Sequence, residues 1–394
     1  MPFTCPFPPL RLKGRELLPI VQGGMGVGVS AHRLSGAVAA FNAVGTIASV
    51  DLRRLHPDLM ARTARGRDMT NCQLKSTINE ANLEALDREI KAAREISGGR
   101  GMLAVNIMRA VSEYAAHVRQ ACKSGIDAIV MGAGLPLDLP EITADFPKVA
   151  LIPILSDARG IALVIKKWLR KGRLPDAIVI EHPRFAGGHL GAARESDVGN
   201  ARFDFDNVIP GALAAVRDLG VDPASIPLIP AGGINSPEKV AQMFALGASA
   251  VQLGTPFAVT EEGDAHPNFK RVLAEAKPED IVTFMSVAGL PARAVRTPWL
   301  ANYLKRAEKL SAAAVGKAHK CTLVWDCLAS CGLRDSLPQA GQFCIDNQLA
   351  AALDGDVDKG LFFRGAERLP FGSAIRPVKD LIEFMLSGFT PQRA

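Results

Sequence analysis

Short runs rich in Val, Ile and Leu recur along the chain, and each is followed by a glycine-bearing turn and by apolar positions at helical spacing. This alternation is typical of a parallel sheet built from strand–helix units, in which helices cover the sheet on both faces. The pattern predicts eight strands: Leu18–Gln22, Val44–Ala48, Met102–Ile107, Ala128–Met131, Ala150–Leu155, Ala177–Glu181, Leu228–Ala231 and Ala250–Leu253.

The spacing of these strands favours a closed (β/α)8 TIM barrel over an open doubly wound sheet. Most strands start about 22 to 27 residues after the previous one, and two longer intervals indicate insertions. The insertion after strand two, residues 51–101, is expected to be helical, and the second spans about residues 184–207. We expect residues 15–300 to form the barrel and residues 301–394 to form a mainly helical, cysteine-containing extension. The helix of the first insertion has one apolar face, formed by Leu83, Leu86, Ile90, Ala93 and Ile96.

The first helix of the barrel is expected to follow strand one directly. Ser30 has the residue type and the position of an N-cap, since it precedes a segment with apolar residues at helical spacing. We therefore expect the Ser30 side chain to cap this helix.

Composition indicates a soluble globular protein. With 394 residues, of which 48% are hydrophobic and 22% charged, the chain can bury a large core. The net charge of +6 is a mild excess that does not indicate nucleic-acid binding. The most apolar stretch, residues 35–50, is too short and too interrupted to span a membrane. Seven cysteines without a secretory leader predict reduced thiols and a cytoplasmic location.

Two glycine turns follow the last two predicted strands: Gly232-Gly233 after strand seven and Gly254-Thr255 after strand eight. In a barrel these turns are neighbours at the C-terminal face, where the fold commonly binds phosphate. Glycines let backbone N–H groups approach the phosphate, and the N-terminus of the following helix stabilises its charge. Each turn alone could be a simple strand–helix connection, but two on adjacent strands favour a phosphate site.

The glycines after strand one, in the segment Gln22–Gly28, lack the G-x-G-x-x-G spacing of a dinucleotide site. They suit a planar ring that lies against the backbone at the barrel mouth. Asn106, near the end of strand three, offers a donor and an acceptor to the edge of such a ring. Its alternative role is that of a turn-forming Asn bonded to its own backbone.

His189 lies in the glycine-rich segment Ala186–Gly191, after strand six. Loops at this end of barrel strands carry the catalytic groups of the fold, and a pKa near 6.5 suits general acid or base catalysis. The alternative is a histidine that only shapes its loop. His182 is a weaker candidate because Pro183 restricts its backbone. His266 is expected to order the connection to the C-terminal part.

Taken in order, these segments resemble the nitronate monooxygenase family, formerly called 2-nitropropane dioxygenases, which includes FMN-containing enoyl-acyl-carrier-protein reductases. The resemblance covers roughly residues 15–300. The segments that carry it are Gln22–Met25, Val105–Met108, Ala186–His189, Ala231–Ile234, Gln252–Thr255 and His266–Lys270.

The resemblance implies FMN as the cofactor, with His189 as the catalytic residue on the reactive side of the flavin. Its phosphate would lie at the two glycine turns, and its ring against the loop after strand one. The segment Glu181–Phe185 departs from the shorter, glycine-containing stretch of relatives, so we expect a remodelled substrate side. The cofactor-binding residues implied are Gln22, Gly23, Gly24, Met25, Asn106, Gly188, Gly232, Gly233, Gln252, Leu253, Gly254 and Thr255.

The leading hypothesis is a nitronate monooxygenase-type enzyme, in which the flavin takes electrons from an alkyl nitronate and passes them to O2 while His189 positions or deprotonates the substrate. One alternative is an NAD(P)H-dependent FMN reductase of enoyl thioesters or quinones. Another is a barrel that binds a phosphate ligand without redox chemistry. The expected partner is a small-molecule substrate, not nucleic acid or membrane, and the chain is compatible with a homodimer.

Four of the seven cysteines, within 24 residues, lie in the C-terminal extension: Cys321, Cys327, Cys331 and Cys344. Clustered thiolates can hold zinc or an iron–sulfur cluster. Their spacing matches no standard ligand pattern, however, and a buried free cysteine is an ordinary core residue. The sequence leaves a metal or cluster open and predicts no metal site.

Overall fold

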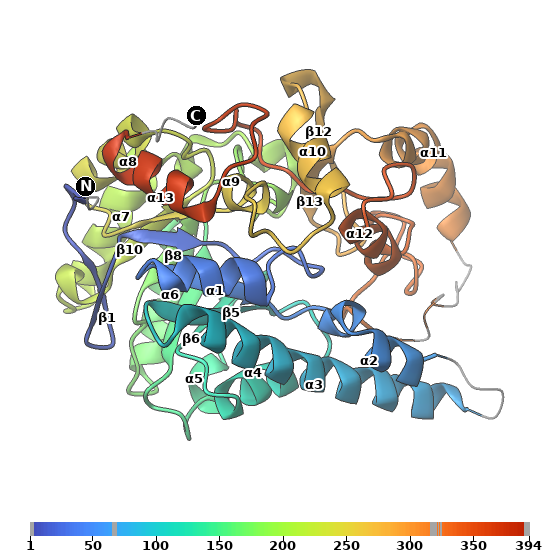
Figure 1. Ribbon diagram of the computed structural model, residues 1–394, viewed down its shortest axis with the longest axis horizontal. Coiled ribbons are helices and arrows are strands. Elements are labelled where there is room, and N and C mark those ends of the chain that lie inside the picture. The colour runs from blue at the N-terminus through green and yellow to red at the C-terminus, as the bar shows by residue number, and fades with distance from the viewer. Residues whose placement is uncertain (1–3, 65–68, 316–320, 322, 324, 390–394) are drawn as a thin grey trace.

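The computed structural model describes residues 4–64, 69–315, 321, 323 and 325–389, and its centre is a closed barrel of parallel strands (Figure 1). Neighbouring strands follow the order β10, β11, β3, β4, β5, β6, β7, β8. Each predicted apolar run coincides with one of these strands, so the predicted (β/α)8 barrel is confirmed. Their bounds are β3 Ile20–Gln22, β4 Val44–Ala48, β5 Met102–Met108, β6 Ala128–Gly132, β7 Ala150–Leu155, β8 Ile178–Glu181, β10 Leu228–Ala231 and β11 Val251–Leu253.

Helices follow the strands and cover the outside of the barrel. Outward side chains such as Ile47 and Ile129 pack with these helices in the largest apolar cluster. Inward side chains such as Ala104, Val130 and Ile152 fill the barrel interior. The helices are α1 His32–Ala40, α2 Pro57–Arg62, α3 Asn71–Ser97, α4 Tyr114–Lys123, α5 Leu139–Ile142, α6 Ala158–Leu169, α7 Phe205–Asp218, α8 Pro237–Ala245 and α9 Thr255–Ala258.

A short hairpin of β1 Leu10–Leu12 and β2 Arg15–Leu17 closes the N-terminal end of the barrel. The side chains of Leu10, Leu12 and Leu17 are at most 2% exposed and belong to the interior cluster. The hairpin therefore leaves the opposite, C-terminal end of the barrel for the site.

The insertion after β4 is mainly helical, as predicted, and consists of the 3-10 helix η1 Leu52–Leu55, α2 and α3. The long helix α3 packs against α1 and α4. Of its predicted apolar face, Leu86, Ile90 and Ala93 are buried, whereas Ile96 is 43% exposed near the end of the helix. The insertion after β8 contains β9 Gly188–His189 and the 3-10 helices η2 Glu195–Asp197 and η3 Ala201–Phe203.

A distant carboxylate caps the N-terminus of α1. Asp264 accepts hydrogen bonds from the backbone N–H groups of Ala31 and Leu34, at 2.8 and 3.1 Å. Ser30 Oγ instead accepts from the N–H of Met25, at 2.8 Å. The expectation that Ser30 caps this helix is wrong, because tertiary structure supplies a charged acceptor that also complements the helix dipole.

Beyond β11 the chain leaves the barrel repeat, as predicted, and its regular elements are mostly helices joined by long loops. A small antiparallel sheet, in which β13 pairs with both β12 and β9, was not predicted. Helix α13 returns to the barrel and contacts α8, as Figure 1 shows. The domain boundary at residue 300 stays a prediction. The elements are α10 Pro267–Glu275, η5 Pro278–Asp280, β12 Ile281–Met285, β13 Pro291–Val295, α11 Pro298–Ala314, α12 Ile345–Leu353 and α13 Val378–Ser387, and one further 3-10 helix, η4 Pro223–Ser225, lies within the barrel before β10.

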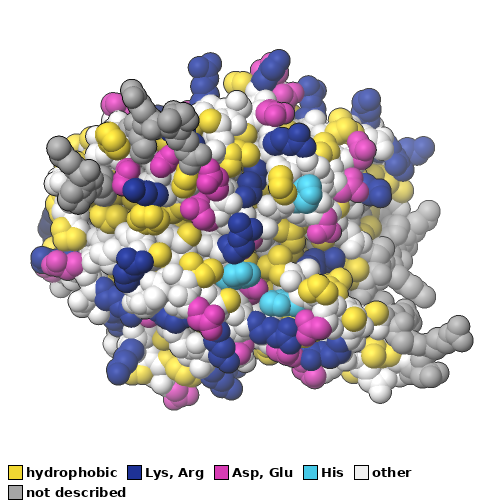
Figure 2. Space-filling view, in the orientation of Figure 1, with side chains coloured by type: hydrophobic (Ala, Val, Ile, Leu, Met, Phe, Trp, Pro, Cys, Tyr) yellow, Lys and Arg dark blue, Asp and Glu magenta, His cyan; other side chains and the backbone are white. Residues whose placement is uncertain are grey.

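Basic and acidic side chains are interspersed on the face seen in Figure 2, in keeping with the small net charge of the chain. Within the described residues, every helix is too short or too polar to cross a membrane.

Candidate active site

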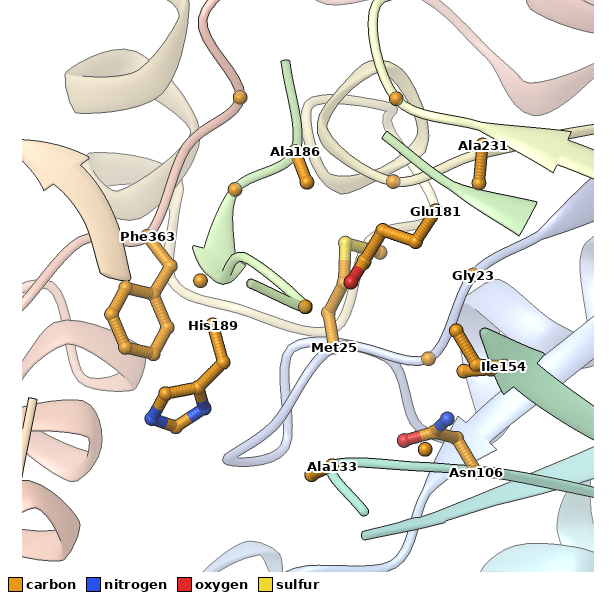
Figure 3. Close-up of a pocket in the computed structure, with 18 of the residues that line it drawn as sticks. Gly23, Met25, Asn106, Ala133, Ile154, Glu181, Ala186, His189, Ala231 and Phe363 are labelled. Carbon is orange, nitrogen blue, oxygen red and sulfur yellow. The ribbon is translucent and has the colours of Figure 1, made fainter. Parts of the chain in front are cut away.

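A cavity of about 630 Å³ lies at the C-terminal ends of the barrel strands. The loops after the barrel strands line one side of it, and β9, the β12–β13 turn and the segments around α12 line the other. Figure 3 shows the side chains of Asn106, Glu181 and His189 turned toward this space from three different elements. The volume lies in the range of about 300 to 1,000 Å³ that is usual for cofactor and ligand sites.

The structure brings the predicted site residues together, with one exception. Gln22 is 0% exposed and does not line the cavity. Its Nε2 donates to the carbonyl of Thr46 at 3.0 Å and its Oε1 accepts from the Thr46 N–H at 2.8 Å, so it ties β3 to β4. The roles of the other residues toward a cofactor remain predictions. Those that line the cavity are Gly23, Gly24, Met25, Asn106, Gly188, His189, Gly232, Gly233, Gln252, Leu253, Gly254 and Thr255.

The two glycine turns lie side by side, because β10 and β11 are paired neighbours in the barrel. Gly232 and Gly233 have φ angles of 98° and 77°, a conformation that glycine adopts without strain. A Cβ at Gly254 would have only Met25 Sδ within 4 Å, at 3.9 Å, so its backbone faces open space. Helix α9 begins at Thr255, which places the N–H groups of its first turn at the same edge.

Charged side chains complete this edge of the cavity. Arg368 and Glu367 both line it, and Lys239 lies 3.4 Å from the Glu367 carboxylate. Lys239 also donates to the carbonyl of Gly233 at 2.8 Å. The open backbone of Gly254 and the cation Arg368 suit an anionic group such as a phosphate, whereas the charge of Lys239 is paired with that of Glu367.

The loop after β3 lies directly against the end of β5. A Cβ at Gly24 would be 2.3 Å from the Cβ of Asn106, so only glycine fits there. A Cβ at Gly23 would be 3.2 Å from the amide nitrogen of Gln252. This strip of backbone beside an amide group suits the edge of a planar heteroaromatic ring, which needs both donors and acceptors.

His189 lies on β9, opposite Ala292 of β13, with its ring centroid 5.8 Å from that of Phe363. Its Nε2 is 2.7 Å from Ser286 Oγ. Burial lowers the pKa of His189 to about 4, so the imidazole is neutral at pH 7. Because Ser286 Oγ already accepts from the N–H of Ala288 at 3.1 Å, its own proton is available for Nε2. This pattern favours the tautomer that carries its N–H on Nδ1.

Glu181 lines the cavity although it is not among the predicted site residues. It is the last residue of β8 and lines the cavity, and burial raises the pKa of its carboxyl to about 7. A Cβ at Gly191 would lie 3.0 Å from its Oε2, so this carboxyl reaches the backbone two residues beyond His189. The available signal was a carboxylate closing an apolar barrel strand, where side chains of this fold reach the site.

The other two histidines considered from the sequence, His182 and His266, have structural roles. His182 is 2% exposed, and its Nε2 is 3.2 Å from Asp204 Oδ1. His266 is the N-cap of α10, and its ring Nδ1 accepts a hydrogen bond from the backbone N–H of Asn268 at 3.1 Å. The backbone N–H of His266 donates to the carbonyl of Leu353 at 3.0 Å. The expectation that His266 orders the connection to the C-terminal part is confirmed.

Cys321, Cys327 and Cys331 are thiols outside any disulfide. Cys327 lines the cavity, and burial raises its pKa, so its thiol stays protonated at neutral pH. Across the described ranges, no three His, Cys, Asp or Glu side chains come together as a metal-ligand set. The geometry therefore gives no support to a metal or cluster at these cysteines.

Comparison with known proteins assigns the family. Residues 14–388 match the nitronate monooxygenase family. The chain is 27% identical over 288 residues to a probable nitronate monooxygenase of Bacillus subtilis strain 168, which covers 72% of this chain and 77% of that protein.

Two solved structures share the fold. Nitroalkane oxidase from Streptomyces ansochromogenes has a TM-score of 0.62 and 20% identity, over 93% of this chain and 94% of its own. FabK from Thermotoga maritima has a TM-score of 0.61 and 22% identity, over 93% of this chain and 91% of its own. Because the family match spans nearly the whole chain, the protein belongs to the nitronate monooxygenase family of FMN-dependent oxidoreductases.

Proposed function

We propose that this enzyme oxidises alkyl nitronates with O2, using FMN held in the cavity and His189 as the residue that contacts the substrate. The position of His189 carries the proposal: its imidazole is neutral, faces the cavity and is held through Nε2 by Ser286. Membership of the family and the similarity to the probable nitronate monooxygenase of Bacillus subtilis support this class of reaction.

The described residues fit FMN. Gly254 offers open backbone to the phosphate, Gly232 and Gly233 have positive φ angles in the adjacent turn, and Arg368 adds a cation at the same edge. The loop after β3 offers backbone groups to the ring, and Asn106 offers an amide. When bound, FMN supplies the redox chemistry, accepting two electrons from the substrate and passing them to O2.

His189 has properties suited to an anionic carbon acid. A nitronate is already deprotonated, so it needs a hydrogen-bond donor more than it needs a strong base. The N–H on Nδ1 can donate to a nitronate oxygen while Ser286 fixes the orientation of the ring. An anion beside the ring raises the pKa of His189, so we expect substrate binding to draw a proton toward the imidazole.

Oxygen consumption by the purified protein tests this proposal. The protein should carry about one FMN per chain, identified by visible absorbance and mass spectrometry. Adding the nitronates of primary or secondary nitroalkanes should start saturable oxygen uptake, which the parent nitroalkanes at acidic pH should not. A fully FMN-loaded protein that consumes no oxygen with any nitronate would disprove the proposed function.

A further inference from the structure

The cavity continues beyond the barrel mouth into an apolar compartment, which we call the apolar wing. The residues that line the apolar wing are Leu290, Leu328, Ile345, Leu349, Leu361 and Phe363. All of them except Leu290 belong to one hydrophobic cluster of the C-terminal part, so they form a continuous surface.

The walls of the apolar wing are anchored on the barrel and on the first insertion. Leu328 forms an antiparallel bridge with Val111 in the loop after β5. Three residues earlier, Trp325 is 3% exposed against α3, and its Nε1 donates to Asn79 Oδ1 at 2.7 Å. The wing is thus a preformed compartment, which reduces the entropy cost of filling it.

The apolar wing begins at His189. The ring of Phe363 lies next to the His189 ring, as Figure 3 shows. On another side, Leu290 immediately precedes Pro291, whose carbonyl accepts from the N–H of Leu190 at 3.0 Å. A molecule with its reactive group at His189 can therefore extend directly into the wing.

The charges around the apolar wing do not favour an anionic tail. Asp346 lines the wing, and its Oδ2 is 2.5 Å from Nη2 of Arg54. This ion pair occupies the Arg54 guanidinium, so it does not offer a free cation to the wing. The other polar group there is the protonated thiol of Cys327. The arginines among the described lining residues lie outside the wing. Arg202 of η3 lies 3.9 Å from the carboxylate of Asp157, and Arg368 lies at the phosphate edge.

We propose that the apolar wing binds the hydrocarbon chain of the substrate, so that the enzyme prefers nitronates with an unbranched, uncharged tail of several carbons. This inference rests on the proposed function, since the reacting group of such a substrate is placed at His189. It assigns a substrate-binding role to the C-terminal extension and, through Trp325, to the insertion on which that extension is anchored.

Binding of inert chains tests the apolar wing without catalysis. Straight-chain primary alcohols from ethanol to decanol are titrated into the FMN-loaded protein, and the dissociation constant is measured by calorimetry and by flavin fluorescence. We expect it to fall about fourfold for each added CH2 until the wing is filled, as burial of a methylene group predicts. A dissociation constant that does not change with chain length would overturn the proposal.

Oxidation of a nitronate series gives the second readout. From nitroethane to 1-nitrooctane, kcat/KM should rise with chain length, and a nitronate with a terminal carboxylate should react at least tenfold more slowly than the uncharged nitronate of equal length. Equal rates for the charged and uncharged tails would contradict the inference.

Substitution of Leu349 locates the effect. The preference is the ratio of kcat/KM for the nitronate of 1-nitrooctane to that for the nitronate of nitroethane. Leu349→Trp narrows the wing and should lower this ratio at least tenfold. Leu349→Asn should also lower the ratio, because it makes the wing polar without adding bulk. The matched control is Leu163→Trp on the outer face of α6, where Leu163 is 38% exposed. It should leave the preference unchanged. An unchanged preference in both folded Leu349 variants would remove the wing from the substrate site.

The two proposals fail in distinguishable ways. Chain-length-dependent alcohol binding without nitronate oxidation would disprove the proposed function and leave the apolar wing standing. Nitronate oxidation without any chain-length dependence, together with absent alcohol binding, would disprove the wing and leave the proposed function standing.

Discussion

Two side chains that face the cavity are shifted by burial toward their neutral forms. Burial lowers the pKa of His189 to about 4 and raises that of Glu181 to about 7. Removal from water disfavours the charged form of both groups. The imidazole of His189 therefore binds a proton more weakly than it would in water, and the carboxylate of Glu181 binds a proton more tightly. The substrate anion would therefore meet a neutral imidazole and a carboxyl group that is half ionised near pH 7.

Replacing His189 should separate catalysis from cofactor binding. His189→Ala should retain FMN and lower kcat/KM for nitronates by about 10² to 10³, because it removes the donor at the reacting group. Ser286→Ala should lower it by about tenfold, because the ring loses one hydrogen bond that orients it. Steady-state kinetics and the FMN content check both variants, and the pH profile of Ser286→Ala should also shift. Full turnover in His189→Ala would take His189 out of the site.

Glu181 should set the pH dependence of substrate binding. Its carboxyl is neutral well below pH 7 and ionised well above it, so between pH 6 and pH 8 the cavity gains a negative charge. The KM for a nitronate anion should rise on the order of tenfold across that range through like-charge repulsion. Glu181→Gln should abolish this rise, and Glu195→Gln, at an exposed position of η2, should not.

Stability gives an independent readout for Glu181. Folding raises the pKa of Glu181 from about 4.5 to about 7. Between these pH values the folded chain holds a proton that the unfolded chain has released, so the free energy of unfolding falls as pH rises from about 4.5 to 7. Glu181→Gln should therefore be more stable than the native chain at pH 8 and lose that advantage below pH 4.5 in urea unfolding. Equal pH dependence in both proteins would show that Glu181 is not buried in this way.

Single residues were predictable where local sequence determines their place. The glycines around His189 and the strand before it were enough to place this side chain in the cavity. Gln22 was misplaced because its side-chain amide hydrogen-bonds to the backbone of Thr46, a contact that no local pattern reveals. The cap of α1 was missed for the same reason, since Asp264 is more than 200 residues away in the sequence.

At the level of elements, the turn after β11 offers the clearest test of the phosphate site. Gly254→Asp should lower the FMN content to below about a tenth of one per chain, because a carboxylate would face the phosphate from an unobstructed position. Gly254→Asn is the matched neutral control and should retain more FMN. Substitution of Gly233 is less informative, since its positive φ and the Phe185 ring would add strain. Equal FMN content in the two Gly254 variants would place the phosphate elsewhere.

The barrel strands were predictable as elements because buried parallel strands have continuous apolar sequences. The strands β12 and β13 were not, because the pairing of β13 with β12 and with the distant β9 depends on tertiary structure. Their absence from the prediction matters for the site, since the turn that joins them carries Ser286 and Leu290.

At the scale of the whole molecule, the two additions to the barrel meet. Trp325 of the C-terminal extension packs against α3 of the insertion, and Arg54 after β4 pairs with Asp346 of α12. The sequence located both additions but contained no sign of their contact, because their residues are separated by the length of the barrel. Together they hold the side of the cavity that faces away from the strands.

Trp325 should be important for this arrangement. Trp325→Ala removes a buried side chain and its hydrogen bond to Asn79, and should lower the free energy of unfolding by about 3 to 5 kcal/mol. Trp325→Phe keeps most of the apolar contact and should cost less. Urea unfolding measures both values. A loss below about 1 kcal/mol in the alanine variant would mean that the contact with α3 contributes little to stability.

The proposed function requires that nitronates reduce the flavin of this enzyme. Anaerobic stopped-flow mixing of the FMN-loaded protein with alkyl nitronates, NADH and NADPH tests it most directly. Nitronates should bleach the flavin absorbance rapidly, and either nicotinamide should bleach it little or not at all. Rapid reduction by NADH or NADPH, with no reduction by any nitronate, would contradict it.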